Sequence, residues 1–126
     1  VSEIDELNIL QASLLAMERA VSSLSILPEY VLVDGIHLPN WNYKSQAIIK
    51  GDQKVASIAA ASIVAKVFRD RELVSLDSAY PQFDFRANKG YPTKKHLRAL
   101  VKYGPCPIHR FSFAPVLKNV RADSAF

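Results

Sequence analysis

The chain has 126 residues, of which 49% are hydrophobic and 22% charged, and its formal net charge is +4. This size and balance predict one globular domain with a modest core. No apolar run approaches the roughly 20 residues of a membrane span, and the acidic start Val1–Asp5 shows no secretory signal. The single cysteine, Cys106, excludes an internal disulfide, so a reducing, cytoplasmic location is expected.

The first predicted elements are one amphipathic helix and two short strands. Apolar residues recur at helical spacing over residues 3–24, and Ser2 can cap the start of this helix. Tyr30–Val33 is a β-rich, almost wholly apolar run, which predicts a central strand covered on both faces. After a loop over residues 36–46, Ala47–Ile49 forms a second short apolar run.

Two further helices are predicted in the second half of the chain. The first covers residues 54–78, and the small side chains of Ala56–Ala65 predict that it is buried against a sheet. Tyr80-Pro81 ends it, and Thr93 caps a short helix over residues 94–103. Two short strands cannot shield two apolar helices, so more strands are needed than the sequence contains. This pattern predicts either a fragment of an α/β domain whose earlier strands are missing or a sheet completed by another chain.

Positive and negative charges are segregated along the chain. Arg86–Arg121 holds nine Lys or Arg residues and no Asp or Glu, whereas the first 85 residues hold seven basic and eleven acidic residues. A basic segment attached to an acidic half predicts a polyanion held against a carboxylate site. The alternative is a solvated basic surface helix.

Asp34 and Asp52 are the candidate metal ligands. Each follows an apolar, strand-like run, and each adjoins a glycine, Gly35 or Gly51. Two carboxylates at the carboxyl ends of neighbouring strands repel each other unless a cation lies between them. Their hard oxygen atoms suit Mg²⁺ or Mn²⁺, whereas the three histidines lack the spacing of zinc ligands. The alternative is that each Asp only caps the turn that follows it.

A basic loop is the candidate nucleic-acid contact. Residues 82–92 are predicted as a loop, and Lys89–Lys95 combines a glycine, the ring of Tyr91 and three lysines. Such a ring can stack on a base or a sugar while the lysines contact phosphates. The alternative is that Tyr91 packs over the start of the following helix.

Four other residues have chemically active side chains. His109 and Arg110 could contact phosphate, although a structural or substrate-positioning role is preferred for His109. Cys106 is interpreted as a small apolar residue in a turn, since no base is evident beside it. Asp70, in the long helix, is interpreted as a salt-bridged structural residue. The remainder, residues 108–126, is predicted to be irregular or briefly helical.

Taken together, these segments resemble the successive motifs of the ribonuclease HII family. The resemblance covers nearly the whole chain in the family's order and spacing. It is carried by Val33–Gly35 with Leu38-Pro39, Lys50–Asp52, Ile58–Arg71, Lys89–Thr93, Ile108–Arg110 and Ser112–Val116.

The resemblance implies a ribonuclease H-like α/β fold: a five-stranded mixed sheet flanked by helices, with a helical C-terminal extension. Residues 1–80 would then be part of the catalytic domain, and residues 81–126 a basic, substrate-binding extension of the same folding unit. Three Asp and one Glu hold divalent metal in the family, and Asp34 and Asp52 resemble the third and fourth of them. Tyr91 resembles the ring that stacks at the RNA-to-DNA junction. The other implied substrate contacts are Lys50, Lys89, Lys94, His109 and Arg110.

The implied activity is endonucleolytic hydrolysis of the RNA strand of RNA–DNA hybrids, including ribonucleotides embedded in duplex DNA. It uses Mn²⁺ or Mg²⁺ and leaves a 5′-phosphate and a 3′-hydroxyl, and the intact enzyme is expected to be a monomer. The family's Asp-Glu-Ala-Gly-Arg-Gly motif, on the first of three strands expected before Val1, does not occur here. The active site is therefore expected to be incomplete and this chain alone to hydrolyse little or nothing. Two alternatives are a non-catalytic basic nucleic-acid-binding module and a purely structural fragment of a larger assembly.

Overall fold

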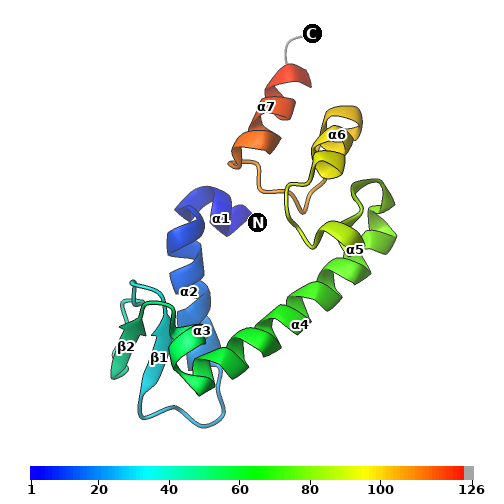
Figure 1. Cartoon of the computed structure of the whole chain (residues 1–126). Helices are drawn as coiled ribbons and strands as arrows, with labels where there is room; N and C mark the ends of the chain where they lie inside the picture. The colour runs from blue at the N-terminus through cyan, green and yellow to red at the C-terminus, as the bar shows by residue number, and fades with distance from the viewer. Residues whose placement is uncertain (124–126) are drawn as a thin grey trace. The chain divides into compact units, whose positions relative to one another are not determined.

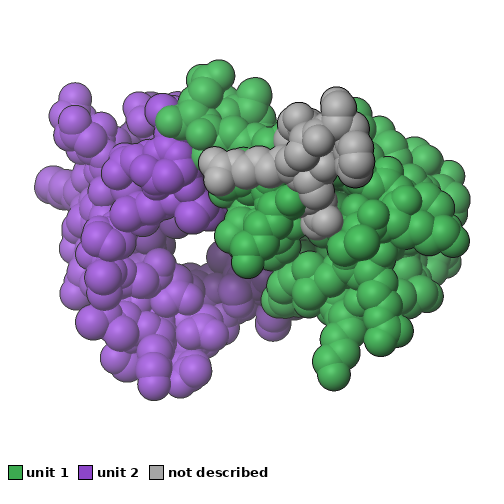
Figure 2. Space-filling view, turned by 90° about the horizontal axis from the view of Figure 1, so that it is seen from above, with its two compact units in different colours: residues 1–6, 66–126 green, residues 7–65 purple. Residues whose placement is uncertain are grey.

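A computed structural model describes the backbone of residues 1–123 and the side chains of residues 1–118 (Figure 1). The chain forms two compact units, one of Val1–Glu6 with Lys66–Phe126 and one of Leu7–Ala65 (Figure 2). The elements in chain order are α1 Ser2–Leu7, α2 Ile9–Ser22, β1 Val31–Asp34, β2 Ser45–Ile48, α3 Gly51–Lys54, α4 Ala56–Ala79, the 3₁₀ turn η1 Pro81–Phe83, α5 Phe85–Asn88, α6 Lys94–Tyr103 and α7 Ala114–Asp123.

The two strands of the 7–65 unit form a parallel pair. Val31 lies opposite Ser45, and Asp34 lies opposite Ile48. Because the strands are parallel, both carboxyl ends lie at the same edge of the sheet, which is where α/β proteins place their functional groups. The α/β class is therefore confirmed. Within residues 1–123, however, β1 pairs with β2 alone, so the prediction that β1 is a central strand is wrong for the described sheet.

The predicted first helix is divided at Asn8. Asn8 has a φ of 70°, which Asn tolerates better than most residues do. Its side-chain Oδ1 accepts hydrogen bonds from the backbone N–H groups of Leu10 and Gln11, at 3.0 and 3.2 Å. Asn8 therefore caps α2, whereas Ser2 lies inside α1 rather than before it. Apolar spacing alone missed this break because the spacing continues on both sides of it.

The long helix α4 is exposed where burial was predicted. All of residues 61–69 are exposed, and the side chains of Ile63 and Phe68 are 65% and 68% accessible. The alanine-rich segment is thus helical as expected but is not covered by the described part of the chain. Along residues 1–123, no helix combines the length and the hydropathy needed to cross a membrane.

The other unit has an apolar core built from short elements. The segment predicted as a loop over residues 82–92 contains η1 and α5, which contribute Phe83 and Phe85 to that core. The predicted helix over residues 94–103 is confirmed as α6, and the Thr93 hydroxyl accepts a hydrogen bond from the His96 N–H at 3.2 Å. The core consists of Leu73, Phe83, Phe85, Ala99, Leu100, Cys106 and Val116.

A carboxylate ties the start of the chain to this same unit. The two oxygens of Asp5 accept hydrogen bonds from the backbone N–H groups of Phe111 and Ser112, at 3.0 and 2.9 Å, and from the Ser112 hydroxyl. These bonds, above all the one from the Ser112 hydroxyl, lower the pKa of Asp5. Asp5 therefore fixes α1 against the segment that precedes α7.

Candidate functional site

Asp34 is the last residue of β1 and is held in place by a neighbouring turn. Its Oδ1 accepts a hydrogen bond of 2.8 Å from the backbone N–H of Gly51. The next residue, Gly35, continues the strand pairing by donating its N–H to the Ile48 carbonyl at 3.0 Å. The carboxylate thus lies at the sheet edge and is exposed. It caps the turn after β2, not the turn that follows it in sequence.

Glycine is required at position 51 by close packing. A Cβ atom there would lie 2.7 Å from Ile58 Cδ1 and 3.4 Å from Asp34 Oδ1. Ile58 is buried, so its side chain has little room to move away. The preceding residue, Lys50, adopts a left-handed conformation with a φ of 55°, which turns the chain sharply from β2 into α3. The sequence pattern Lys50–Asp52 therefore encodes a tight turn against the end of β1.

Asp52 follows Gly51 directly in α3, so its backbone lies beside the carboxylate of Asp34. Asp52 is exposed, and neither of its carboxylate oxygens accepts a hydrogen bond from the part of the chain that the structure describes. The same holds for Asp34 Oδ2. The Asp34 carboxylate is thus held at the sheet edge by the Gly51 N–H, whereas Asp52, which is exposed, lies in α3 rather than at the end of β2.

This donor set fits a hard divalent cation. Mg²⁺ is commonly held by one or two carboxylates together with water and substrate phosphates. Among the described residues, no group of three or more His, Cys, Asp or Glu side chains is placed to hold a metal. The described residues therefore do not form a complete metal site by themselves, and the metal role of Asp34 and Asp52 stays a prediction.

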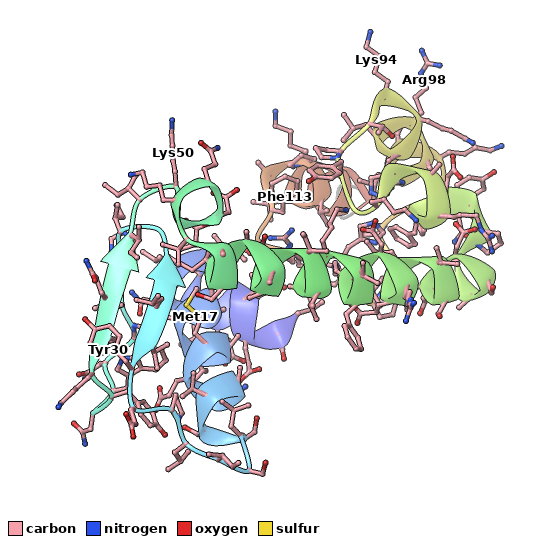
Figure 3. The ribbon with its side chains drawn as sticks, turned by 60° about the horizontal axis from the view of Figure 1, so that its bottom comes forward. Met17, Tyr30, Lys50, Lys94, Arg98 and Phe113 are labelled. Atoms are coloured by element: carbon pink, nitrogen blue, oxygen red, sulfur yellow. The ribbon has the colours of Figure 1, made fainter. Side chains whose placement is uncertain are left out.

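The basic segment forms an exposed face on α6. Lys94 and Arg98, one helical turn apart, extend from the same side of the helix (Figure 3). Neither forms an ion pair with the described residues. Arg98 was predicted only as part of the basic segment. Its spacing of four residues from Lys94 could have identified it as a second candidate for phosphate contact on the same helix face.

Two other basic residues of the segment are neutralised by acids from outside it. Lys95 lies 2.6 Å from Asp84, and the Arg86 guanidinium lies 3.6 Å from Asp77. Segregation of charge along the sequence therefore overstates the segregation in space. The free positive charge of α6 is confined to one of its faces.

The loop that carries Lys89 and Tyr91 is a tight turn. Lys89 and Gly90 both have positive φ angles, 50° and 81°, and the Tyr91 N–H donates to the Asn88 carbonyl at 2.9 Å. The side chain of Tyr91 is 65% accessible, so the alternative in which it packs over the start of α6 is wrong. Its ring is free to stack on a ligand.

His109 is placed differently from the other predicted substrate contacts. Its side chain is only 7% accessible and packs between the ring of Phe83 and that of His96. Direct contact with phosphate is therefore wrong for this residue, and the structural role is favoured. Arg110, next to it, is exposed, and its guanidinium lies 5.8 Å from the centre of the Phe113 ring. Its phosphate contact stays a prediction.

Cys106 is buried as expected, but the expectation that no base lies beside it is wrong. Its Sγ lies 3.1 Å from His109 Nδ1. Burial raises the pKa of the Cys106 thiol, so the neutral form is favoured, which agrees with the interpretation of Cys106 as a small apolar residue. The spacing of three residues between Cys106 and His109 was the signal that sequence reasoning overlooked.

Asp70 is confirmed as a salt-bridged residue. Its carboxylate pairs with Lys66, one turn earlier in α4, rather than with either neighbouring arginine. Among the predicted site residues, Asp34, Lys50 and Asp52 lie in the 7–65 unit. The remaining ones, Lys89, Tyr91, Lys94, His109 and Arg110, lie in the other unit.

The burial of His109 predicts that stability depends on pH. Burial, and next the neighbouring His96, lower the pKa of His109 from its ordinary value of 6.5. A base with a lowered pKa in the folded state stabilises that state while it is neutral, and this contribution is lost as pH falls below 6.5. Asp5 also has a lowered pKa, but its contribution is lost only as pH falls below 3.8.

The free energy of unfolding of the full chain should therefore decline between about pH 7 and about pH 5, where the Asp5 carboxylate stays ionised in both states. Urea titrations across this window measure the decline. His109→Phe should reduce it, whereas the control His37→Phe, at an exposed histidine, should leave it unchanged. If the free energy of unfolding of His109→Phe declined as much as that of the unmodified chain, His109 would not be the source of the pH dependence.

Comparison with known proteins gives one consistent family. The sequence model for ribonuclease HII matches residues 1–116. The chain is 56% identical over 121 residues to the ribonuclease HII of Nitrosococcus oceani. The matched region covers 96% of this chain and 60% of the length of that protein. It is also similar to the crystal structure of ribonuclease H2 from Pyrococcus horikoshii OT3, with a TM-score of 0.76 and 27% identity over 99% of this chain and 67% of that one. The chain belongs to the ribonuclease HII family.

Proposed function

We propose that this protein hydrolyses the RNA strand of RNA–DNA hybrids, including single ribonucleotides embedded in duplex DNA, as a metal-dependent endonuclease. The observation that carries the proposal is the hydrogen bond from Gly51 to Asp34, which holds the Asp34 carboxylate at the sheet edge next to the backbone of Asp52. A Mg²⁺ site for phosphoryl chemistry commonly uses one or two carboxylates with water and substrate phosphates, and Asp34 and Asp52 would supply two. The family's name supports the class of reaction.

Each residue of the proposed site has a separate task. Asp34 and Asp52 would hold the divalent ion. When bound, the ion supplies Lewis-acid stabilisation of charge at the phosphate and favours deprotonation of the attacking water. The Gly51 N–H keeps Asp34 in one orientation, and the exposed Lys50 beside it is positioned to contact a backbone phosphate. The products are a 5′-phosphate and a 3′-hydroxyl.

Substrate recognition is assigned to the other unit. Lys94 and Arg98 contact the phosphate backbone, as do Lys89 and Arg110, and the exposed ring of Tyr91 stacks at the junction between RNA and DNA. A hybrid duplex is A-like and carries a 2′-hydroxyl on one strand, which distinguishes it from duplex DNA. The roles of residues 1–80 as part of a catalytic domain and of residues 81–126 as a basic, substrate-binding extension stay predictions. The cytoplasmic location and the monomeric state also stay predictions.

The metal role of Asp34 can be tested in a chimera. The chain replaces the matching segment of the Nitrosococcus oceani ribonuclease HII, to which it is 56% identical. In this background Asp34→Asn should lower the rate of cleavage of a duplex containing one ribonucleotide, in Mn²⁺, by more than about 100-fold, because even outer partners of a metal site contribute about 10–100-fold. Binding of the same duplex should be retained, since the substitution removes a negative charge.

The matched control is Asp70→Asn, which removes a carboxylate that pairs with Lys66 on the surface and should change the rate little. If Asp34→Asn cleaves as fast as the parent, the protein is better described as a nucleic-acid-binding module. The 126-residue chain alone should hydrolyse little or nothing, because its described residues supply only the two carboxylates. Cleavage by the chain alone at the rate of the chimera would contradict that expectation.

The basic face of α6 makes a prediction about salt. Removing one phosphate contact should reduce the slope of log affinity against log salt by about one. The double variant Lys94→Ala with Arg98→Ala should therefore bind the ribonucleotide-containing duplex with a slope lower by about two. Lys66→Ala, whose ammonium is paired with Asp70, removes the same kind of charge elsewhere and should change the slope less. If Lys66→Ala lowered the slope by as much per charge removed as the double variant does, the affinity would depend on net charge and not on the α6 face.

A further inference from the structure

Three buried polar side chains lie together in the apolar core of the unit that carries Tyr91. Asn88, His96 and His109 are each less than a tenth exposed, and the two imidazole rings stack with their centres 5.3 Å apart. Buried polar groups are costly unless each finds a partner, so such a cluster has a specific hydrogen-bond arrangement. The proposed reaction uses none of these three residues.

The backbone around His109 assigns its proton. The Cys106 N–H donates to His109 Nδ1 at 3.0 Å, so this nitrogen is an acceptor and carries no hydrogen. His109 Nδ1 also lies 3.3 Å from the Cys106 carbonyl, but a nitrogen that accepts the Cys106 N–H cannot also donate, and that carbonyl already accepts the backbone N–H of His109 at 2.9 Å. The proton of neutral His109 therefore lies on Nε2.

This assignment determines the state of His96. Its Nε2 lies 3.3 Å from His109 Nε2, so it accepts the proton that His109 donates. The proton of His96 then lies on Nδ1, which is 3.2 Å from the Phe83 carbonyl and donates to it. All four ring nitrogens are satisfied with both rings neutral, and the hydrogen bonds run in one direction from Cys106 to Phe83.

The turn that carries Lys89 and Tyr91 is attached to the end of this series. Asn88 Nδ2 donates to the same Phe83 carbonyl at 2.7 Å and lies 3.4 Å from His96 Nδ1. The other end of the amide, Oδ1, accepts the Gly90 N–H at 2.8 Å. The orientation of the Asn88 amide is thus set from inside the core. It fixes a turn in which a lysine with a φ of 50° needs external support.

We propose that His96 is a positioning residue for nucleic-acid binding: through Phe83 and Asn88, the buried hydrogen-bond series holds the 88–91 turn in the conformation that presents Lys89 and Tyr91 to the ligand. The identity of that ligand, a ribonucleotide-containing duplex, rests on the proposed function. The arrangement of the hydrogen-bond series does not rest on the proposed function, because it follows from distances within the chain.

None of the hydrogen bonds and ring contacts of the two imidazoles within the described part of the chain joins them to a charged side chain. Cys106 is the titratable side chain that contacts His109, and burial keeps its thiol neutral. Asp84 and Arg86, next to the core segments, pair with Lys95 and Asp77, and Arg110 lies over the Phe113 ring. The helix α6 itself also carries the cations Lys94, Arg98 and Lys102, and a cation does not favour a second proton. A proton added to His96 Nε2 would set two donors face to face, and one added to His109 Nδ1 would oppose the Cys106 N–H. Protonation therefore breaks the series.

The first test is the protonation state itself, in the unmodified 126-residue chain with ¹⁵N-labelled histidine. Long-range ¹H–¹⁵N spectra near pH 7 should show His109 as the Nε2–H form and His96 as the Nδ1–H form, both neutral. The opposite assignment for either ring, or a charged ring, overturns the proposal. This measurement requires no variant, so it stands even if a substituted core fails to fold.

The second test separates positioning from general stability. In His96→Phe, which keeps an aromatic ring in the core, the Gly90 and Tyr91 amides should exchange with solvent about five- to tenfold faster, the effect of one lost hydrogen bond. The Gly104 amide, which closes the end of α6 on the Leu100 carbonyl, should be unchanged. Val101→Ala, at an exposed position of the same helix, is the control. Equal acceleration at all three amides would mean that His96 acts only on stability and would overturn the proposal.

The third test links the turn to the ligand. Affinity for the ribonucleotide-containing duplex should fall about five- to tenfold in His96→Phe, and no further fall should occur when Lys89→Ala and Tyr91→Ala are both already present. Additive losses would overturn the proposed route through the turn. If the unmodified chain does not bind the duplex, the proposed function fails on that point. The histidine tautomers and the exchange rates of the Gly90 and Tyr91 amides still decide whether the buried hydrogen-bond series holds the 88–91 turn in place.

Discussion

The Gly51 N–H donates to the carboxylate of Asp34 across a separation of 17 residues, and the candidate metal site depends on this hydrogen bond. It joins the end of β1 to the start of α3, and it forms only because residue 51 has no side chain in the space next to Ile58. The parallel register of the two strands sets both partners at one edge. A slip of one residue would turn the Asp34 side chain to the other face of the sheet. The position of Asp52, one residue further on, follows from the same contact.

Local signals in the sequence predicted the elements around this site. A carboxylate after an apolar run, with a glycine beside it, correctly indicated a strand end for Asp34, and Thr93 with Gly104 gave both ends of α6. These features succeed because turn and cap chemistry depends on neighbouring residues. The roles of Asp34, Asp52 and the basic residues stay predictions, since a metal ion and a nucleic acid have still to be tested against them.

Contacts between distant segments could not be predicted in the same way. The buried pair of His96 and His109 joins α6 to the loop after it, and the neutralisation of Lys95 depends on Asp84, eleven residues earlier. The prediction from composition that α4 is buried was wrong for the described part of the chain. Its alanines predicted a covered helix, yet Phe68 lies exposed. Small side chains permit close packing but do not show what packs there. The break at Asn8 was missed because periodicity registers helical spacing and not the backbone angle of one residue.

Asp34 and Asp52 are proposed to bind one divalent ion together. Paramagnetic Mn²⁺, titrated into the ¹⁵N-labelled 126-residue chain, tests this most directly, because it broadens the amide signals of residues close to the ion. We expect the Gly35 and Gly51 amides, which lie next to Asp34 and Asp52, to be lost first, and Asp34→Asn or Asp52→Asn each to abolish that selective loss. Broadening centred on other carboxylates, or selective broadening that survives both substitutions, would contradict it.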